Sequence, residues 1–474
     1  MTKADLGLIG LAVMGQNLVL NMERNGFTIA VYNRTTARID EFINEKGLGK
    51  NIIGCYNLES FCYALKSPQI ILLMVQAGKP IDSIISQLLP ILKSGDIIID
   101  GGNSFYKDTI RRSENLKKKG IHYLGIGISG GEEGALRGPS IMPGGSLKAW
   151  NQVEEIFMKI SAKIDGKSCC SYIGSDGAGH YVKMVHNGIE YSDMQLIAEV
   201  YFLLKKLLNL TAYETADIFA EWNKGNLNSY LIQITSKILS ERDPETGEPL
   251  VDMILDSAQQ KGTGKWTSQE ALEIGEPVPS ITEAVYARNI SSKKEERIKA
   301  SKNLEGPIPD FSGERHMLIE AACKALLASK ICSYAQGFSL LKAASEEYEW
   351  RLNLSKIAQI WRNGCIIRAG FLEQIMRAFQ KEEDLNNLLL DSYFADILNK
   401  SQKEWRYVVK LAVKNGIPVP ALSSALSYYD SYRNPSLPTN LIQAQRDYFG
   451  AHGFERVDKE QGVLIHYDKW TLDE

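Results

Sequence analysis

Short β-rich apolar runs alternate with helical patterns through the first third of the chain, and this alternation restricts the folds that the chain can adopt. Helical patterns, of which MGQNLVLNMERNG (14–26) is an example, lie between several of these runs. Such alternation is typical of a mostly parallel sheet with helices on both faces. We therefore predict a doubly wound α/β domain in residues 1–177. The expected strands are LGLIG (6–10), FTIAVYN (27–33), IILLMV (70–75), DIIID (96–100), HYLGIGIS (122–129) and CSYIG (170–174).

Long amphipathic runs replace this alternation after about residue 178, and they predict a large all-α domain in residues 178–434. The segment SERDPETGEP (240–249) should be a loop, and the two prolines of RNPSLPTN (433–440) should end the domain. Residues 435–474 are expected to form a mixed C-terminal tail, for which a partner subunit is one candidate contact. The runs expected to be helical are 180–208, 211–223, 227–241, 251–260, 268–275, 314–347, 354–379, 382–398 and 401–415.

Composition excludes several classes of protein. The net charge of −3 over 474 residues gives no broad positive field for nucleic acid or anionic lipid. No apolar stretch of about 18 residues occurs, and the N-terminus lacks a basic region with a cleavage site, so we expect neither a membrane span nor a signal peptide. Seven cysteines without a C-x-x-C pair indicate reduced thiols in a cytoplasmic protein. The six histidines show no metal-ligand spacing, so we expect no metal site.

A glycine-rich turn joins the first expected strand to the first expected helix. Its pattern is G-x-A-x-x-G, with Ala12 where the usual fingerprint has a second glycine. Glycines allow a tight turn, and the N-terminus of the helix offers free N–H groups to a pyrophosphate. Strand–turn–helix units also use glycine for steric reasons alone, but the position of this turn favours a dinucleotide site in a Rossmann-like domain. The cofactor contacts expected here are Gly10, Leu11, Ala12, Val13, Met14 and Gly15.

The end of the second expected strand indicates which dinucleotide is bound. A site for NAD usually has Asp or Glu there to bind the ribose 2′-hydroxyl. This chain has Asn33, Arg34 and Thr35 instead. An arginine fork and a hydroxyl can hold a 2′-phosphate, which an acidic side chain would repel. A plain polar turn is the alternative, but together with the glycine-rich turn these residues favour NADP.

Two polar loops follow later strands, where doubly wound folds bind their ligands. They are DGGNS (100–104) and GISGGEEGALRGPSIMPGG (127–145). Amide, hydroxyl and backbone donors from Asn103 and from Ser129, Gly130 and Gly131 could hold a polyol or a carboxylate, although such loops can also be sharp turns. The segment KGTGKW (261–266) resembles a phosphate loop, but it lacks the glycine spacing of a Walker motif.

The segment HYVKMVHNGIEY (180–191) places reactive groups where a helix is normally apolar. Its polar residues recur at helical spacing and therefore share one face of the predicted helix. Apolar residues cover the other faces, so this polar stripe should be partly buried. A buried polar network that ties helices together is one explanation, and a catalytic surface is the other. The residues of the stripe are Lys183, His186, Asn187, Glu190 and Tyr191.

Seven motifs, in order from residue 6 to about residue 454, together resemble the decarboxylating 6-phosphogluconate dehydrogenases of the β-hydroxyacid dehydrogenase superfamily. They are GLAVMGQNLVLNM, VYNRT, DGGNS, GISGGEEGALRGPSIMPGG, KMVHNGIEY, KGTGKW and QAQRDYFGAH. The resemblance implies oxidative decarboxylation of 6-phosphogluconate with NADP+ to ribulose 5-phosphate, CO2 and NADPH. It also implies a homodimer, chemistry without a metal, and a place in the oxidative pentose phosphate pathway.

The resemblance assigns roles within the polar stripe. Lys183 is the expected general base for the C3 hydroxyl, and its ordinary pKa of about 10.4 must therefore be lowered. Glu190 is the expected proton donor to C1 of the product. Seven helical residues separate the two Cα atoms by roughly 10 Å along one face. His186, Asn187 and Tyr191 are the expected substrate contacts.

Further contacts follow from the same resemblance. Lys261 and Arg288 are expected at the substrate, and Arg446 and His452 should come from the partner subunit. Around the cofactor the resemblance adds Val75, Gln76, Ala77 and Asn103. Gln76 departs from the family, because relatives often have lysine at this position, which puts one possible cofactor phosphate contact in doubt.

Three other functions are compatible with parts of the pattern. A β-hydroxyacid dehydrogenase for a smaller substrate would not need the chain length and the tail. An NAD-dependent relative would not be expected to have Asn33, Arg34 and Thr35. A non-catalytic NADP-binding protein would have no need of Lys183 and Glu190.

Overall fold

The computed structural model describes residues 3–260, 262–468 and 470. It divides into two compact units, Met1–Ala425 and Leu426–Glu474. Among the described residues, no helix combines the length and the apolar character needed to cross a membrane.

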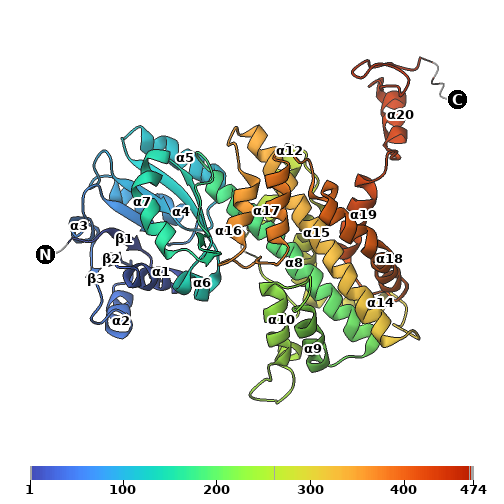
Figure 1. Cartoon of the computed structure of the whole chain (residues 1–474), viewed down its shortest axis with the longest axis horizontal. Helices are drawn as coiled ribbons and strands as arrows, with labels where there is room; N and C mark the ends of the chain where they lie inside the picture. The colour runs from blue at the N-terminus through green and yellow to red at the C-terminus, as the bar shows by residue number, and fades with distance from the viewer. Residues whose placement is uncertain (1–2, 261, 469, 471–474) are drawn as a thin grey trace. The chain divides into compact units, whose positions relative to one another are not determined.

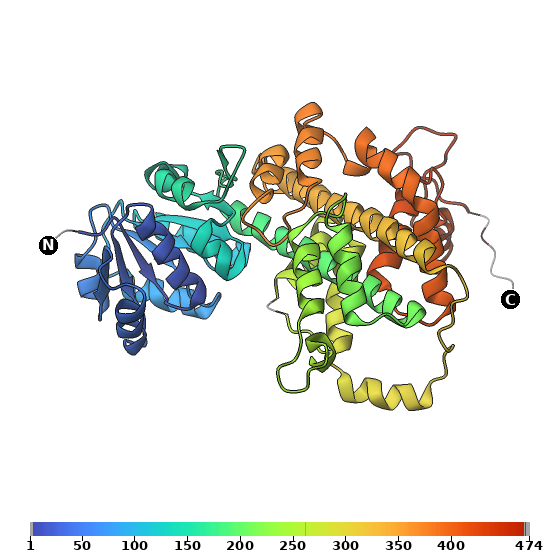
Figure 2. The same ribbon diagram turned by 60° about the horizontal axis from the view of Figure 1, so that its bottom comes forward.

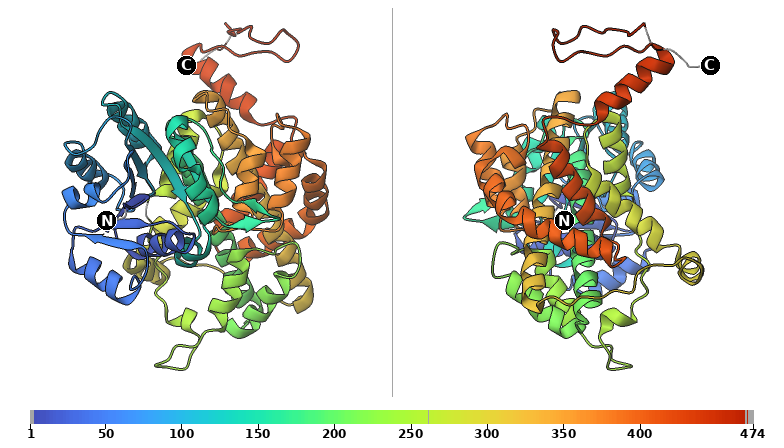
Figure 3. Two further views of the ribbon diagram at one scale, coloured as in Figure 1. Left: turned by 60° about the vertical axis from the view of Figure 1, so that its left-hand side comes forward. Right: turned by 90° about the vertical axis from the view of Figure 1, so that its right-hand side faces the viewer.

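The N-terminal part of the first unit is built on a seven-stranded sheet, with helices on both faces (Figures 1 and 3). The strand order is β3-β2-β1-β4-β5-β6-β7, and every neighbouring pair is parallel except β6 and β7. The strands are β1 (Leu6–Ile9), β2 (Ile29–Tyr32), β3 (Ile52–Cys55), β4 (Ile70–Leu73), β5 (Ile97–Asp100), β6 (His122–Ile128) and β7 (Ile141–Gly145).

Two hydrophobic cores fill the layers on the two sides of this sheet. One core contains residues of α1 (Val13–Arg24), α2 (Ala37–Glu45) and α7 (Leu147–Ile160). The other contains residues of α3 (Leu58–Tyr63), α4 (Lys79–Leu88) and α5 (Tyr106–Lys117). The prediction of a Rossmann-like domain is therefore confirmed.

Three details of the predicted sheet are wrong. Residues 170–174 form only isolated bridges, from Cys170 to Ile141 and from Gly174 to Gly144. Strand β3 was not expected. The predicted loop at 127–145 contains both α6 (Gly131–Arg137) and β7. The IMPGG sequence of β7 resembles a turn, but proline is tolerated there because β7 is the edge strand.

After β7 and the short hairpin of β8 (Lys163–Ile164) and β9 (Lys167–Ser168), the chain is helical. The two longest helices, α8 (Ala178–Leu208) and α15 (Arg315–Glu347), pack against each other in the helical domain (Figure 2). The other helices are α9 (Ala212–Trp222), α10 (Tyr230–Ser240), α11 (Leu250–Met253), α12 (Thr263–Ile274), α13 (Pro279–Ser291), α14 (Lys294–Asn303), α16 (Leu354–Trp361), α17 (Leu372–Lys381), the 3-10 helix η1 (Leu388–Leu390), α18 (Ser392–Lys414) and α19 (Pro420–Tyr432).

The large all-α domain is confirmed, but several predicted helices are wrong in extent. The run 354–379 is broken between Trp361 and Leu372, where Gly364 takes a φ of +69°. Only Leu250–Met253 is helical near the predicted run 251–260. One helix, α18, replaces the two runs expected between 382 and 415, and α13 and α14 were not expected. The domain boundaries 1–177, 178–434 and 435–474 stay predictions, although α8 begins at Ala178.

The second unit contains α20 (Thr439–Gly450). After this helix the chain folds back on itself, and this return segment pairs Phe454 with Ile465 in an antiparallel bridge. The buried Asp447 carboxylate holds this return, because it accepts hydrogen bonds from the backbone N–H groups of Gly453 and Tyr467. Large apolar side chains of the unit are exposed, among them Leu441, Ile442, Phe449 and Leu464.

Glu199 of α8 holds the first turn of α19. Its buried carboxylate accepts hydrogen bonds from the N–H groups of Ala421 and Leu422, both at 2.9 Å. Burial raises the pKa of Glu199 to about 7 from an ordinary 4.5, against the opposing effect of these donors. The folded state therefore binds this proton more tightly than the unfolded state. The resulting contribution to stability is fully present below pH 4.5 and is lost as the pH rises through about 7.

We predict that Glu199→Ala lowers the free energy of unfolding by about 1–3 kcal/mol, because it leaves buried N–H groups without an acceptor. Glu199→Gln keeps one acceptor oxygen and should flatten the fall in stability between pH 5 and pH 8. Urea unfolding at these two pH values measures both effects. An unchanged pH dependence in Glu199→Gln would show that this carboxyl does not titrate as described.

Candidate active site

The first turns of α8 lie directly on strands β6 and β7, and glycines make this contact possible. A methyl group at Gly127 of β6 would overlap the Cβ atom of Lys183, and one at Gly125 would overlap the ring of His180. On the helix itself, a methyl group at Gly179 would overlap the carbonyl oxygens of Gly125 and Met142. The helix backbone can approach the strands this closely only because these positions lack side chains.

The polar stripe of α8 is buried. Lys183 is 6% exposed and His186 is fully buried, whereas the Glu190 side chain is 21% exposed. The His186 ring donates from Nδ1 to Asn187 Oδ1 at 3.0 Å and lies 3.2 Å from Ser129 Oγ through Nε2. With Nδ1 as donor, Nε2 accepts from the Ser129 hydroxyl, which is the pattern of a neutral imidazole.

Burial shifts the pKa values along this stripe toward the neutral forms. It lowers the pKa of Lys183, with partial opposition from Glu190 and Cys365. It holds the pKa of His186 well below its usual range, helped by the charge of Lys183. Burial also raises the pKa of Glu190, against the attraction of Lys183 and Arg288. The stripe therefore contains a weakened acid, a neutral imidazole and an amine that gives up its proton more easily.

Residues 263–267 of α12, which overlap the KGTGKW segment, pack against the same stripe. Thr263 Oγ1 accepts a hydrogen bond from Asn187 Nδ2 at 3.3 Å, and Thr267 Oγ1 donates to the carbonyl oxygen of Met184 at 2.9 Å. A side chain at Gly264 would overlap the ring of Tyr191. The glycine and threonines of this segment therefore seat α12 on α8. Lys261, a predicted substrate contact, lies outside the described residues.

Arg288 of α13 lies at the far end of the stripe. Its guanidinium carbon is 3.5 Å from the centre of the Tyr191 ring, and Nη1 donates to the carbonyl oxygen of Gln259 at 3.2 Å. Burial lowers the pKa of Arg288, and Tyr191 and Glu190 oppose this effect. The predicted substrate contacts Tyr191 and Arg288 therefore lie together, beside Glu190.

The predicted substrate loop after β6 continues from the buried Ser129 into a sharp turn. Gly130 and Gly131 have φ values of +107° and +61°, which side chains rarely adopt. The turn also lacks space for a side chain, because a methyl group at Gly130 would come within 2.6 Å of the Gly364 carbonyl oxygen. The structure thus brings Ser129 to His186 and the glycine turn to the 362–371 segment.

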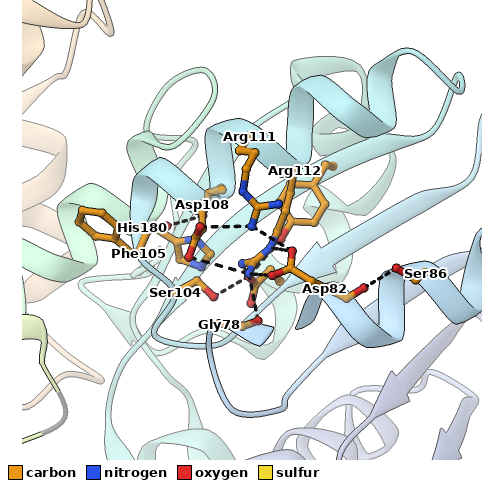
Figure 4. Close-up of polar contacts among 12 residues, drawn as sticks. Gly78, Asp82, Ser86, Ser104, Phe105, Asp108, Arg111, Arg112 and His180 are labelled. Atoms are coloured by element: carbon orange, nitrogen blue, oxygen red, sulfur yellow. Dashed lines mark hydrogen bonds and ion pairs between the residues drawn. The ribbon is translucent and has the colours of Figure 1, made fainter. Parts of the chain in front are cut away.

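A buried charge network supports the DGGNS loop after β5 (Figure 4). Asp100 accepts hydrogen bonds from the Gly102 N–H at 3.0 Å and from Ser104 Oγ at 2.6 Å. Arg112 connects this loop to the one after β4, because Nη1 donates to Asp100 Oδ2 at 3.5 Å and Nη2 donates to the Gly78 carbonyl oxygen at 3.1 Å. The neighbouring Asn103, predicted to contact cofactor and substrate, is exposed.

A cleft of about 570 Å³ lies beside the ends of β1, β2 and β4. Seven of the predicted cofactor residues line it: Gly10, Ala12, Asn33, Arg34, Thr35, Val75 and Gln76. The Leu11 N–H donates to Asn33 Oδ1 at 3.0 Å, so the glycine-rich turn and the polar turn after β2 are joined. The other predicted cofactor residues, Leu11, Val13, Met14, Gly15, Ala77 and Asn103, are not part of the lining.

Two predicted substrate contacts belong to the second unit. Arg446 Nη1 donates to Gln443 Oε1 at 3.1 Å on α20, and both Arg446 and His452 are exposed.

Comparison with known proteins accounts for this combination of sheet, helix and cleft. Residues 5–174 match the family model described as the NAD binding domain of 6-phosphogluconate dehydrogenase. Residues 179–469 match the model described as the C-terminal domain of 6-phosphogluconate dehydrogenase. The chain belongs to the 6-phosphogluconate dehydrogenase family. The resemblance seen in the sequence motifs is thereby confirmed.

Relatives in this family match the chain over nearly its whole length. The NADP(+)-dependent, decarboxylating 6-phosphogluconate dehydrogenase of Bacillus subtilis is 60% identical, over 99% of this chain and 100% of its own. The decarboxylating 6-phosphogluconate dehydrogenase of Dictyostelium discoideum is 56% identical, over 99% and 97%. The solved Plasmodium falciparum 6-phosphogluconate dehydrogenase has a TM-score of 0.94 and 47% identity, over 98% of this chain and 99% of that one.

Sequence reasoning missed some residues at both sites of this family member. Cys365 is buried in the segment between α16 and α17, near enough to Lys183 to oppose slightly the lowering of the Lys183 pKa, yet that segment was expected to be helical. The glycine and asparagine of Asn363-Gly364 were the available signal for a break. In the cofactor cleft, Arg38, Lys79, Ser83 and Gln87 line the walls, and no sequence motif marks them.

We predict that Gly127→Ala lowers kcat at least about tenfold and the free energy of unfolding by about 1–3 kcal/mol, because the methyl group forces Lys183 away from β6. Steady-state assays and denaturant unfolding measure these effects. Gly134→Ala is the matched control, since the nearest atom to its methyl group would be 3.6 Å away. If both variants retained wild-type kcat, the contact between α8 and β6 would not control the position of Lys183.

Proposed function

We propose that this chain oxidises and decarboxylates 6-phospho-D-gluconate with NADP+, giving D-ribulose 5-phosphate, CO2 and NADPH, without a metal ion. The names of its relatives indicate this reaction. The observation that carries the proposal is the buried stripe on α8, where Lys183 and Glu190 lie on either side of a neutral His186. An amine that loses its proton easily and a carboxyl that keeps its proton suit successive proton transfers.

The cleft beside β1, β2 and β4 fits NADP. Gly10 has a φ of +110°, and a methyl group there would overlap the Met74 carbonyl oxygen. The N-cap of α1, Ala12, makes no side-chain cap, so the first N–H groups of the helix are free for the pyrophosphate. Arg34 and Thr35 would hold the 2′-phosphate. When bound, NADP+ supplies the acceptor for the hydride from C3 of the substrate.

Lys183 handles the proton of the C3 hydroxyl. Its neutral amine takes this proton while the C3 hydride leaves, so that C3 becomes a carbonyl. The product is a β-keto acid, and loss of its C1 carboxylate as CO2 sends an electron pair toward the C3 carbonyl. The protonated amine then stabilises the developing oxyanion by a charge-assisted hydrogen bond, which removes the need for a metal.

Glu190 completes the reaction at the neighbouring carbon. Decarboxylation leaves an enediol whose terminal carbon must gain a proton to become C1 of ribulose 5-phosphate. The raised pKa of Glu190 keeps its carboxyl protonated at higher pH than an ordinary glutamate. We propose that nine further residues hold the sugar acid. They are Asn103, Ser129, Gly130, Gly131, His186, Asn187, Tyr191, Lys261 and Arg288.

We predict that Lys183→Met and Lys183→Arg both lower kcat by about 10²–10⁴-fold, because neither side chain can act as a base near neutral pH. Lys183→Arg is the matched control for lost charge. In the wild type, burial lowers the pKa of Lys183, so activity should rise with pH well below the ordinary lysine value of about 10.4. NADPH formation followed at 340 nm across pH measures this, and substantial turnover in Lys183→Arg would exclude the base assignment.

We predict that Glu190→Gln severely reduces the formation of ribulose 5-phosphate, by about 10²-fold or more. The amide keeps the size of the side chain but cannot donate an acidic proton. Transfer of solvent deuterium into C1 of the product, followed by mass spectrometry, measures this step. Wild-type incorporation in the variant would remove Glu190 from the protonation of C1.

We further propose a homodimer in which Arg446 and His452 of each chain enter the neighbouring subunit's substrate site. The exposed apolar side chains of the second unit, including Leu441 and Phe449, give it a surface suited to a partner. A cytoplasmic location is also proposed, because the seven cysteines are free thiols.

Mixing two inactive variants tests the shared site. In a dimer of Lys183→Met with Arg446→Ala, one site combines the intact Lys183 of one chain with the intact Arg446 of the other. We expect mixtures unfolded and refolded together to regain activity, with at most one working site per mixed dimer. The same variants refolded separately are the control. No recovery in dimers verified as mixed would show that Arg446 serves its own chain.

A further inference from the structure

The cofactor cleft carries more positive charge than the polar turn after β2 accounts for. Arg34, Arg38 and Lys79 all line it. The described lining contains no aspartate or glutamate, since its remaining residues are apolar, glycine, or neutral polar side chains. The charged side chains of the described lining are therefore all cations, and only one of the three, Arg34, has a role in the site as proposed so far.

The two additional cations come from opposite walls of the cleft. Arg38 lies on the first turn of α2, four residues after Arg34. Lys79 is the first residue of α4, which follows β4 on the other wall. Gln76 lines the Lys79 wall and is neutral, so Lys79 is the only cation that this wall contributes among the described lining residues.

Neither additional cation is committed elsewhere. Within the described part of the chain, the side chains of Arg38 and Lys79 form no hydrogen bond or ion pair, and both are exposed. Neighbouring basic residues differ in this respect, because Arg111 and Arg112 are paired with Asp82. Uncommitted cations in a cleft without carboxylates favour a ligand with more negative charge.

The 2′-phosphate of NADP supplies that charge, whereas NAD has a neutral hydroxyl at the same position. A phosphate monoester carries about −1.5 to −2 charges at pH 7 and three acceptor oxygens. One arginine fork pairs with two of the oxygens, so further donors are needed for the third oxygen and for the second charge.

We propose that Arg38 and Lys79 are specificity-determining residues that complete, with Arg34, a three-cation clamp on the 2′-phosphate of NADP. Lys79 supplies from the β4–α4 wall the positive charge that Gln76 lacks. This inference rests on the proposed use of NADP, and it assigns the discrimination against NAD to both walls of the cleft.

Binding without turnover tests the clamp. Titration calorimetry of the full-length protein would compare adenosine 2′,5′-bisphosphate with adenosine 5′-monophosphate, and NADP+ with NAD+. Arg38→Gln and Lys79→Gln should each raise the Kd for the two ligands with a 2′-phosphate about tenfold, because each removes one charge-assisted contact. The Kd for the other two ligands should change less than about twofold. Lys118→Gln is the matched control, since Lys118 is exposed on the same domain and away from the cleft.

Equal losses for ligands with and without the 2′-phosphate, or no loss at all, would overturn the clamp. Both residues are exposed, so the variants should fold, and circular dichroism verifies this. A wild-type protein that binds NADP+ tightly but does not turn over 6-phosphogluconate would contradict the proposed reaction and leave the clamp standing. Normal turnover with unchanged binding in both variants would contradict the clamp alone.

Discussion

The close contact between α8 and the β6–β7 edge of the sheet is the constraint on which the rest of the site depends. Gly125, Gly127 and Gly179 remove the side chains that would otherwise separate helix from strand. The helix that carries Lys183 and Glu190 is therefore fixed against the domain that holds the cofactor cleft. An active site assembled from two domains needs this kind of fixed contact, because errors of about 1 Å in the placement of a catalytic group are costly.

Burial on this contact also sets the chemistry of the stripe. The same desolvation lowers the pKa of Lys183 and raises the pKa of Glu190, so one environment prepares a base and an acid seven residues apart. The α15 helix supports the stripe from behind, because Lys330 and Asp193 form a buried ion pair at 2.5 Å one turn beyond Glu190. The pairing with Lys330 offsets part of the cost of burying the Asp193 charge next to Glu190.

The sequence predicted the local parts of this arrangement and missed the parts that depend on distant contacts. The α8 stripe and the Gly10–Gly15 turn were predicted because helical spacing and strand–turn–helix order depend only on residues that are close together in the sequence. The break after Trp361 was missed because the apolar periodicity of 354–379 continues through it, while Gly364 turns the chain onto Gly130. Arg38 and Lys79 were missed because only the folded sheet brings their two walls together.

The most direct test of the account is the stoichiometry of the purified protein acting on 6-phosphogluconate labelled with ¹⁴C at C1, in the presence of a metal chelator. NADPH would be followed by absorbance and CO2 by trapping the label. We expect one CO2 for each NADPH, with NADP+ strongly preferred over NAD+ and no loss of rate in the chelator. NADPH without released label, or a rate that falls in the chelator and returns with added metal, would contradict it.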